Sequence, residues 1–411
     1  MLAPLLFTDQ CSSVETYSQI CEVRSPMTRR EELALSAAGL CLIGACYGLA
    51  RFAYGLFVPS FRDEFSLDAT ATGVIASGGY VVYCVAVLAA SVLTPRLGAR
   101  GVAVTAGAFA TAGTLTIALA GSTPALVLGV LLGGASSGLV SPALAHAVAH
   151  RVASERQGRV QTVVNAGTGV GVAIAGPIAL LTRDEWREAW LSFAILASLA
   201  TLWAAVRVPG DRGDAPPTGL LPRPFFPPGS LHLTVAAVLA GAASAAVWTF
   251  GRDLMVAEGL DEQGSTVAWI LLGALGAGAG DLAARLGIPA AWSGATLLLA
   301  GATALLAVAP GRLATASVAA ASFGAAYIAV TGLLLVWATR VHPRSPAAGV
   351  GWAFLVLALG QAAGSSALGA VDEASDARTT FVVAALAAVV AAMVRPTARV
   401  SPDAPPRRTR G

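Results

Sequence analysis

The sequence contains no lysine and few charged residues of any kind. Only 12% of its 411 residues are charged, 56% are hydrophobic, and the mean hydropathy is +0.71. A water-exposed surface on a chain of this size needs far more charge, so a soluble globular protein is excluded. Because lysine is absent, all 26 basic residues are arginines, and their positions along the chain are informative.

Cysteine is also scarce, and the chain opens without a signal for secretion. The five cysteines have no spacing suited to a metal site or a disulfide framework: Cys11, Cys21, Cys41, Cys46 and Cys84. The first 27 residues lack a cationic region followed by an apolar one, so we expect a tail there, with Met27 as a candidate initiator. We expect no cofactor and no metal ion.

Long apolar runs fill most of the chain instead. About 20 apolar residues suffice to cross about 30 Å of hydrocarbon. Six such runs lie in the first half, at Leu33–Val58, Ala71–Leu93, Val102–Gly121, Ala125–Ala149, Val160–Leu181 and Ala189–Val206. Six more lie in the second half, at Leu231–Met255, Thr266–Ala284, Ala290–Ala309, Ala314–Thr339, Ala348–Val371 and Thr379–Val394.

A proline- and glycine-rich stretch, Pro209–Ser230, separates the two sets of runs. We therefore predict an all-α polytopic membrane protein with twelve transmembrane helices in two pseudo-symmetric six-helix bundles. The predicted parts are a tail (1–32), a first bundle (33–207), a linker (208–230), a second bundle (231–395) and a tail (396–411).

The two halves repeat short motifs at one spacing. Arg-Leu-Gly at 96–98 recurs at 285–287, after the second run of each half. Arg-Val at 151–152 recurs at 340–341, after the fourth run of each half. Both recurrences have the same offset of 189 residues, which favours a duplicated unit of the kind that transporters use for alternating access.

The arginines are distributed unevenly between the two sides of the predicted membrane. The side that carries both termini has 19 of them, the opposite side has 6, and Arg51 lies within the first run. Cytoplasmic loops carry the excess of basic residues in membrane proteins. We therefore expect a multi-pass protein of the cell (plasma) membrane with both termini in the cytoplasm. The arginine-rich C-terminal tail suits anionic lipid better than nucleic acid.

Three segments resemble a known family. Residues 48–59 resemble the G-x-x-R-F-A-Y-x-x-x-x-P signature of the YbfB/YjiJ-like branch of the major facilitator superfamily, and segments 165–177 and 248–253 are similar to that branch too. The resemblance spreads over residues 33–395. It implies a transporter fold in which the first, fourth, seventh and tenth helices line a central cavity.

The sequence departs from one motif of that superfamily. Between the second and third runs the usual G-x-L-A-D-R-x-G-R-R is replaced by a sequence with Pro95 at the acidic position, followed by Arg96. The second half retains Asp281 near Arg285. We therefore expect gating roles for Arg96, Asp281 and Arg285.

Arg51 is the strongest single indication of a binding site. A guanidinium inside an apolar helix is costly and is expected to face a cavity or a partner. With α-helical spacing, Tyr47, Arg51 and Tyr54 share one stripe, which suits an organic anion whose acid group binds arginine and whose body contacts tyrosine. The alternative is that Arg51 pairs with a neighbouring helix or reaches toward the interface.

The corresponding run of the second half carries Trp248, Arg252 and Asp253. We predict that Trp248 and Arg252 contact substrate and that Asp253 is a coupling or gating residue and a candidate partner of Arg51; a solvated helix boundary is the alternative. His146 is a candidate for proton coupling. Other candidate cavity groups, which equally suit bonding between helices, are Asn165, Tyr327, Thr331 and Gln361.

These features predict a secondary active transporter of a small organic solute, with an organic anion as the favoured cargo, that works by alternating access. The alternatives are an exporter of drugs or metabolites working as an antiporter, and a membrane ligand sensor that moves nothing. An enzyme is not expected, because no nucleophile, metal cluster or carboxylate pair lies at membrane depth. The expected partners are the substrate, a co- or counter-transported proton and the bilayer, and we expect a monomer.

Overall fold

The computed structural model describes residues 27–182, 185–210, 226–276 and 287–396, which form helices and no strands. Two elements, η1 and η2, are π-helical. The first half of the chain contains α2 (Arg29–Ile43), η1 (Gly44–Phe52), α3 (Ala53–Phe65), α4 (Ala69–Leu97), α5 (Ala99–Ala118), α6 (Thr123–Arg151), α7 (Ser154–Leu181) and α8 (Trp186–Arg207). The second half contains α9 (Ser230–Ala245), η2 (Ala246–Phe250), α10 (Gly251–Ala257), α11 (Glu262–Gly276), α13 (Ile288–Val308), α14 (Leu313–Val341), α15 (Pro346–Ala374) and α16 (Ala377–Met393).

The helices follow the predicted apolar runs in order. The elements α2, η1 and α3 form one continuous helix, as do α9, η2 and α10, and each corresponds to one predicted run. Within the described part of the chain, 10 helices are long and apolar enough to cross a membrane. The shorter α16 has 17 residues, and α11 is described as far as Gly276, short of the predicted end of its run.

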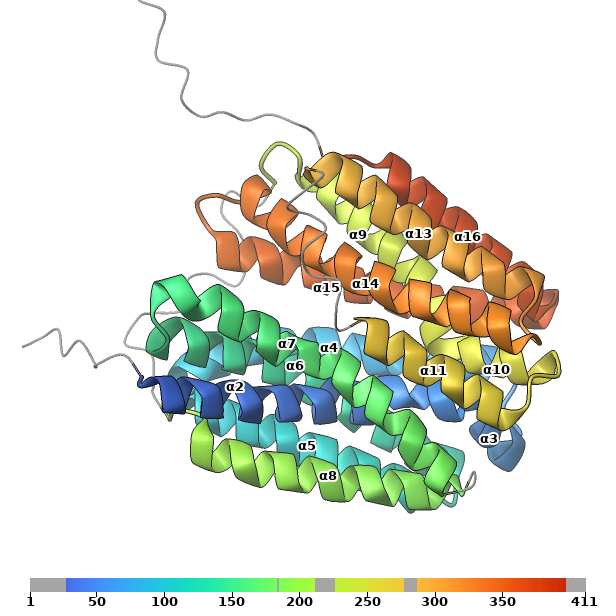
Figure 1. Cartoon of the computed structure of the whole chain (residues 1–411), viewed down its shortest axis with the longest axis horizontal. Coiled ribbons are helices and arrows are strands. Elements are labelled where there is room, and N and C mark those ends of the chain that lie inside the picture. The colour runs from blue at the N-terminus through green and yellow to red at the C-terminus, as the bar shows by residue number, and fades with distance from the viewer. Residues whose placement is uncertain (1–26, 183–184, 211–225, 277–286, 397–411) are drawn as a thin grey trace, which may run out of the picture.

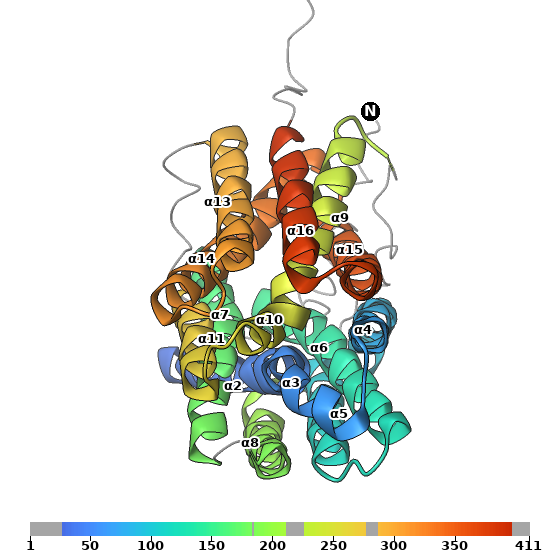
Figure 2. The ribbon, with the colours of Figure 1, turned by 90° about the vertical axis from the view of Figure 1, so that its right-hand side faces the viewer.

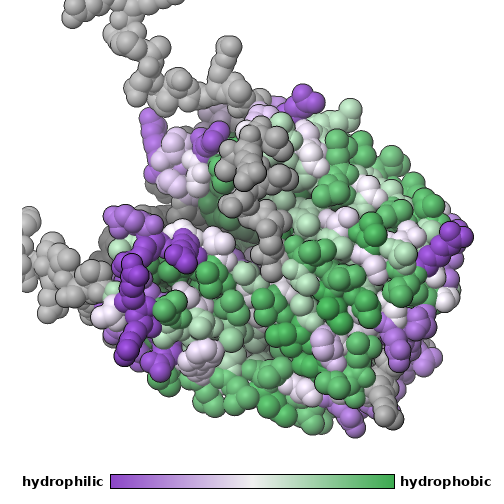
Figure 3. Space-filling model, in the orientation of Figure 1, coloured by the Kyte–Doolittle hydropathy of each residue, from purple (hydrophilic) through white to green (hydrophobic). Residues whose placement is uncertain are grey.

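The helices run roughly parallel to one another, with α2, α5 and α8 of the first half lowest and α9, α13 and α16 of the second half highest (Figure 1). Helices α10 and α11 of the second half lie between them, at the level of α4 and α7, as the view from the right-hand side also shows (Figure 2). We call the end at which α2 begins and α16 finishes the termini end, and the opposite end, where α3 and α10 finish, the far end. On the visible face, hydrophilic side chains gather at both ends and a broad apolar band lies between them (Figure 3). The apolar band is the surface expected to face lipid.

Glycines allow the first helix to pack tightly against α7. A Cβ atom on Gly48 would lie 2.4 Å from the Cα atom of Gly171, and one on Gly171 would lie 2.3 Å from the carbonyl oxygen of Gly44. Close backbone approach through small residues is typical of helix packing in membranes. The glycine-rich segment of α7 is therefore a packing surface.

The two halves also meet through glycines. In the contact of α4 with α15, a Cβ atom on Gly73 would lie 2.2 Å from the carbonyl oxygen of Ser365. In the contact of α7 with α11, one on Gly273 would lie 2.4 Å from the backbone nitrogen of Ala173. These positions lie toward the far end of their helices or near the middle, so tight contact between the halves is concentrated there.

Replacing Gly48 by alanine should destabilise the protein, because the added methyl group must push α7 away. Overpacking of this kind typically costs about 1–3 kcal/mol, which thermal unfolding of purified protein in detergent would show as a lower Tm. Gly301→Ala is the matched control, since Gly301 is exposed on α13 with nothing within 4 Å of the added atom. Equal melting temperatures for the two variants would contradict this account of the packing.

Candidate functional site

Arg51 lies near the end of the π-helical segment η1. Segments of π-helix within α-helices are frequent at functional sites, and their wider turn changes the direction of the side chains. The first long helix of the second half contains its own π segment, η2, and the two segments meet across the halves. Phe52 stacks on Trp248 with ring centroids 4.1 Å apart and an interplanar angle of 26°.

The guanidinium of Arg51 is surrounded by aromatic rings. Its Cζ atom lies 4.1 Å from the ring centroid of Tyr83 and 4.7 Å from that of Tyr80, both on α4. It lies 5.1 Å from the centroid of Phe52 and 5.6 Å from that of Tyr47. All four distances fall within the range of cation–π attraction. We call these four residues the aromatic cage.

Hydrogen bonding leaves the charge of Arg51 incompletely satisfied. Its Nη2 atom donates to Oε1 of Gln361 at 3.4 Å, and its Nε atom is buried without a hydrogen-bond partner. Among the described residues no carboxylate pairs with this arginine. A buried donor without a partner is rare in native proteins and indicates a group that a ligand can satisfy.

Gln361 connects Arg51 to further polar groups of the second half. Its Nε2 atom donates to the hydroxyl of Tyr327 at 3.2 Å and to Oγ of Ser244 at 3.3 Å. The hydroxyl of Thr331, in contrast, donates to the carbonyl oxygen of Tyr327 at 3.0 Å, so it serves its own helix. Arg51, Gln361, Tyr327 and Ser244 thus form one hydrogen-bonded group, which we call the Arg51 cluster. The predicted residues Gln361 and Tyr327 belong to it, and the predicted residue Thr331 does not.

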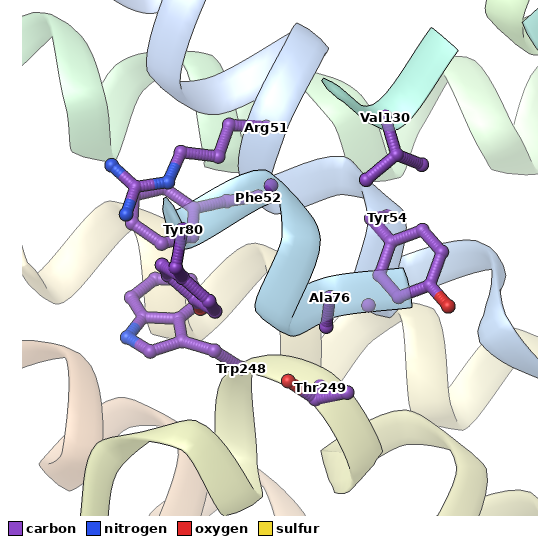
Figure 4. Close-up of a pocket in the computed structure, with 10 residues that line it drawn as sticks. Arg51, Phe52, Tyr54, Ala76, Tyr80, Val130, Trp248 and Thr249 are labelled. Carbon is purple, nitrogen blue, oxygen red and sulfur yellow. The ribbon is translucent and has the colours of Figure 1, made fainter. Parts of the chain in front are cut away.

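A pocket opens next to this cluster, between the two halves (Figure 4). It is narrow and is lined by residues of the first, second, fourth and seventh predicted helices. We call it the central pocket; its lining consists of Arg51, Phe52, Tyr54, Gly55, Ala76, Gly79, Tyr80, Val130, Trp248 and Thr249. The predicted residues Arg51, Tyr54 and Trp248 are thus brought together in one place.

Tyr54 does not share a stripe with Arg51 in the predicted way. The prediction used the α-helical period, and the π-helical turn changes the direction of the following side chains. The hydroxyl of Tyr54 donates to the carbonyl oxygen of Thr72 at 3.1 Å, and in Figure 4 its ring points away from the guanidinium. Tyr80 and Tyr83 of α4 take its expected place beside the charge, and the sequence analysis missed both.

Arg252 lies apart from the central pocket. Its side chain is 3% exposed, its Nη1 atom donates to the carbonyl oxygen of Leu56 at 2.6 Å, and its Nε atom donates to Oγ of Ser265 at 3.1 Å. Leu56 belongs to the first half and Ser265 to the second. Arg252 therefore ties the halves together toward the far end, and it is not among the residues that line the pocket.

Asp253 does not pair with Arg51, so that prediction was wrong. It forms an ion pair with Arg62 of α3, between the two halves. The reason is its depth: Asp253 lies in α10, beyond the π segment and close to the far end, where α3 also finishes. A further contact nearby joins the halves, since the backbone nitrogen of Ala69 donates to Oε2 of Glu373 at 3.3 Å.

The remaining predicted residues lie outside the central pocket. His146 is half-buried on α6 and stacks on His150 with centroids 3.9 Å apart, Asn165 is exposed and accepts a hydrogen bond from Gln161, and Arg96 is exposed at the end of α4. Asp281 and Arg285 fall outside the described residues.

Breaking the Arg62–Asp253 pair should loosen the far end. In Asp253→Asn the cross-half ion pair is lost, so spin labels on the exposed positions Asp63 and Gln263, one in each half, should gain a longer component in double electron–electron resonance. The control is Arg187→Gln, because Arg187 pairs with Glu64 inside the first half. A distance distribution that Asp253→Asn leaves unchanged would mean that the pair does not hold the halves together.

Comparison with known proteins places the chain among membrane transporters. A family model described as the Major Facilitator Superfamily matches residues 40–365. A search among curated proteins gave no match.

Solved structures share the fold at low sequence identity. The nucleoside transporter NupG aligns with a TM-score of 0.70 and 14% identity, covering 87% of this chain and 98% of NupG. A bacterial homologue of the human lysosomal transporter Spinster, in an inward-facing and unoccupied conformation, gives 0.72 and 16%, with 90% and 97% covered. The human organic anion transporter MFSD10 gives 0.67 and 18%, with 88% and 99% covered.

Proposed function

The chain belongs to the Major Facilitator Superfamily, and from that premise we propose that it is a secondary active transporter of a small organic anion. It is a multi-pass membrane transporter of this superfamily, and the family is one of transporters rather than enzymes. The YbfB/YjiJ-like branch is the part of the superfamily that residues 48–59 favour.

The uncompensated charge of Arg51 carries the proposal for an anion. A guanidinium inside the bundle has no carboxylate partner in the described chain, and its Nε donor is free inside the protein. An acid group bound there would receive charge-assisted hydrogen bonds and would neutralise the arginine. The aromatic cage holds the guanidinium in place before the anion arrives.

The contacts between the halves support alternating access. They include the Arg62–Asp253 pair, the bond from Arg252 to Leu56 and the bond from Ala69 to Glu373, all toward the far end. In this arrangement the far end is closed, and we propose that substrate reaches the central pocket from the termini end. Rocking of bundles 33–207 and 231–395 about the 208–230 linker would open the opposite path.

The roles of the other predicted residues belong to the same proposal. Asp253 is a gating residue through its pair with Arg62. The further gating candidates are Arg96, Asp281 and Arg285. His146 is the candidate for coupling to a proton, and a monomer is the proposed transporting unit.

The arginine count supports the proposal that the termini end faces the cytoplasm. A green fluorescent protein fused after the last residue should therefore fluoresce in bacterial cells, while alkaline phosphatase fused at the same place should be inactive, because only the exported phosphatase folds to an active form. The converse pattern would invert the proposed orientation and the direction from which the central pocket is reached.

Arg51→Gln should strongly reduce anion transport. The measurement is uptake of a mixed pool of labelled organic acids by proteoliposomes, with and without an imposed pH gradient. Losing a charge-assisted hydrogen bond of about 1.5–3 kcal/mol corresponds to about tenfold to hundredfold weaker binding. Arg312→Gln is the matched control, because Arg312 is an exposed arginine outside the pocket.

Two outcomes would count against the proposal. Uptake by Arg51→Gln that equals wild-type uptake would remove Arg51 from the substrate path. No accumulation by vesicles of either orientation would exclude organic anions and direct the search to neutral or cationic substrates of an exporter.

A further inference from the structure

A second, mainly apolar pocket lies beside the central one. It is enclosed by α7, α11 and α14 with η2, and we call it the apolar pocket; its lining consists of Thr168, Gly169, Val172, Trp248, Leu272, Gly273, Gly324, Tyr327 and Ile328. Three of these residues are glycines, so part of the wall is bare backbone. Almost all of the remaining lining is hydrocarbon or aromatic ring, which favours an apolar occupant.

Trp248 and Tyr327 stand between the apolar pocket and the Arg51 cluster. Trp248 lines both pockets, and its ring packs edge-on against that of Tyr327 with centroids 5.3 Å apart. The ring of Tyr327 lines the apolar pocket, while its hydroxyl accepts a hydrogen bond from Gln361, the residue that also contacts Arg51. Trp248 and Tyr327 therefore form part of the wall between the Arg51 cluster and the apolar pocket.

Trp248 carries an independent sign of a ligand. Trp248 is 5% exposed, and its Nε1 atom is buried without a hydrogen-bond partner. In Figure 4 this nitrogen lies on the same side of the pocket as the guanidinium of Arg51. Two buried donors, Nε of Arg51 and Nε1 of Trp248, thus lack partners around one pocket, and an acid group has enough oxygen atoms to accept from both.

We propose that the transported anion is amphipathic: its acid group binds Arg51 and Trp248 in the central pocket, and its apolar part occupies the apolar pocket. This inference rests on the proposed function and adds the substrate class. Ile328 then limits the size of the apolar part, because it is half-buried at the wall of the apolar pocket, where Val172 and Leu272 are fully packed.

The test is binding of straight-chain alkanesulfonates, from ethanesulfonate to octanesulfonate, to the full chain in nanodiscs by isothermal titration calorimetry. Sulfonates stay ionised, so protonation does not vary along the series. Each methylene that enters the apolar pocket should raise affinity about fourfold. Because the pocket is small, affinity should level off early in the series. In Ile328→Phe the affinity should level off at a shorter alkyl chain than in the wild type, and in Ile328→Ala at a longer one.

Val318→Phe is the control, because Val318 lies on the same helix with 57% of its surface exposed, away from both pockets. It should reproduce the wild-type series. If Ile328→Phe does not fold, the chain length at which affinity levels off in Ile328→Ala still tests the proposal.

The outcomes separate this inference from the proposed function. Affinities that do not change with chain length, or a levelling point that neither Ile328 variant moves, would overturn the apolar pocket as a substrate site while leaving Arg51-dependent anion binding intact. Failure of the wild-type protein to bind any member of the series would overturn both.

Discussion

One buried positive charge constrains the centre of this molecule. Placing a guanidinium at the middle of a membrane helix costs at least a few kcal/mol. Four rings of the aromatic cage, each contributing about 0.5–2 kcal/mol by cation–π attraction, and the oxygen of Gln361 offset this cost without neutralising the charge. The cage takes rings from the first helix and from α4, so the position of Arg51 fixes how these two elements pack. We therefore propose an anion as the missing partner of this charge.

The two π segments give the centre its geometry. The segment η1 carries Arg51 and Phe52, and η2 carries Trp248, so the stacked pair Phe52–Trp248 joins corresponding helices of the two halves. Toward the far end the halves are held by the Arg62–Asp253 pair and by the bonds of Arg252. The charged groups near the far end thus connect the halves. Arg51, whose Nε atom has no partner, serves in our proposal to bind the ligand.

The fold could be read from the sequence because it depends on local properties. Apolar runs, charged breaks and the repeated motifs give the helices and their order, and the structure agrees within a few residues at most ends. Arg51, Trp248, Tyr327 and Gln361 were found because polar or aromatic groups inside apolar runs stand out. The pairing of these groups was harder to predict, because it depends on depth and on helix rotation.

The errors show where local reasoning fails. Tyr54 was assigned to the Arg51 face with an α-helical period, and the π segment invalidates that period. Tyr80 and Tyr83 were missed because they lie on another helix and their sequence shows no pattern that singles them out. Asp253 was assigned to Arg51 by opposite charge alone, whereas the depth of α10 brings it to Arg62.

The most direct test of the central claim is a structure of the protein with a transported organic anion bound. This account predicts density for the acid group within hydrogen-bonding distance of Nε of Arg51, beside the aromatic cage and the indole of Trp248. An anion whose acid group lies elsewhere, for example against Arg252 at the far end, would contradict it.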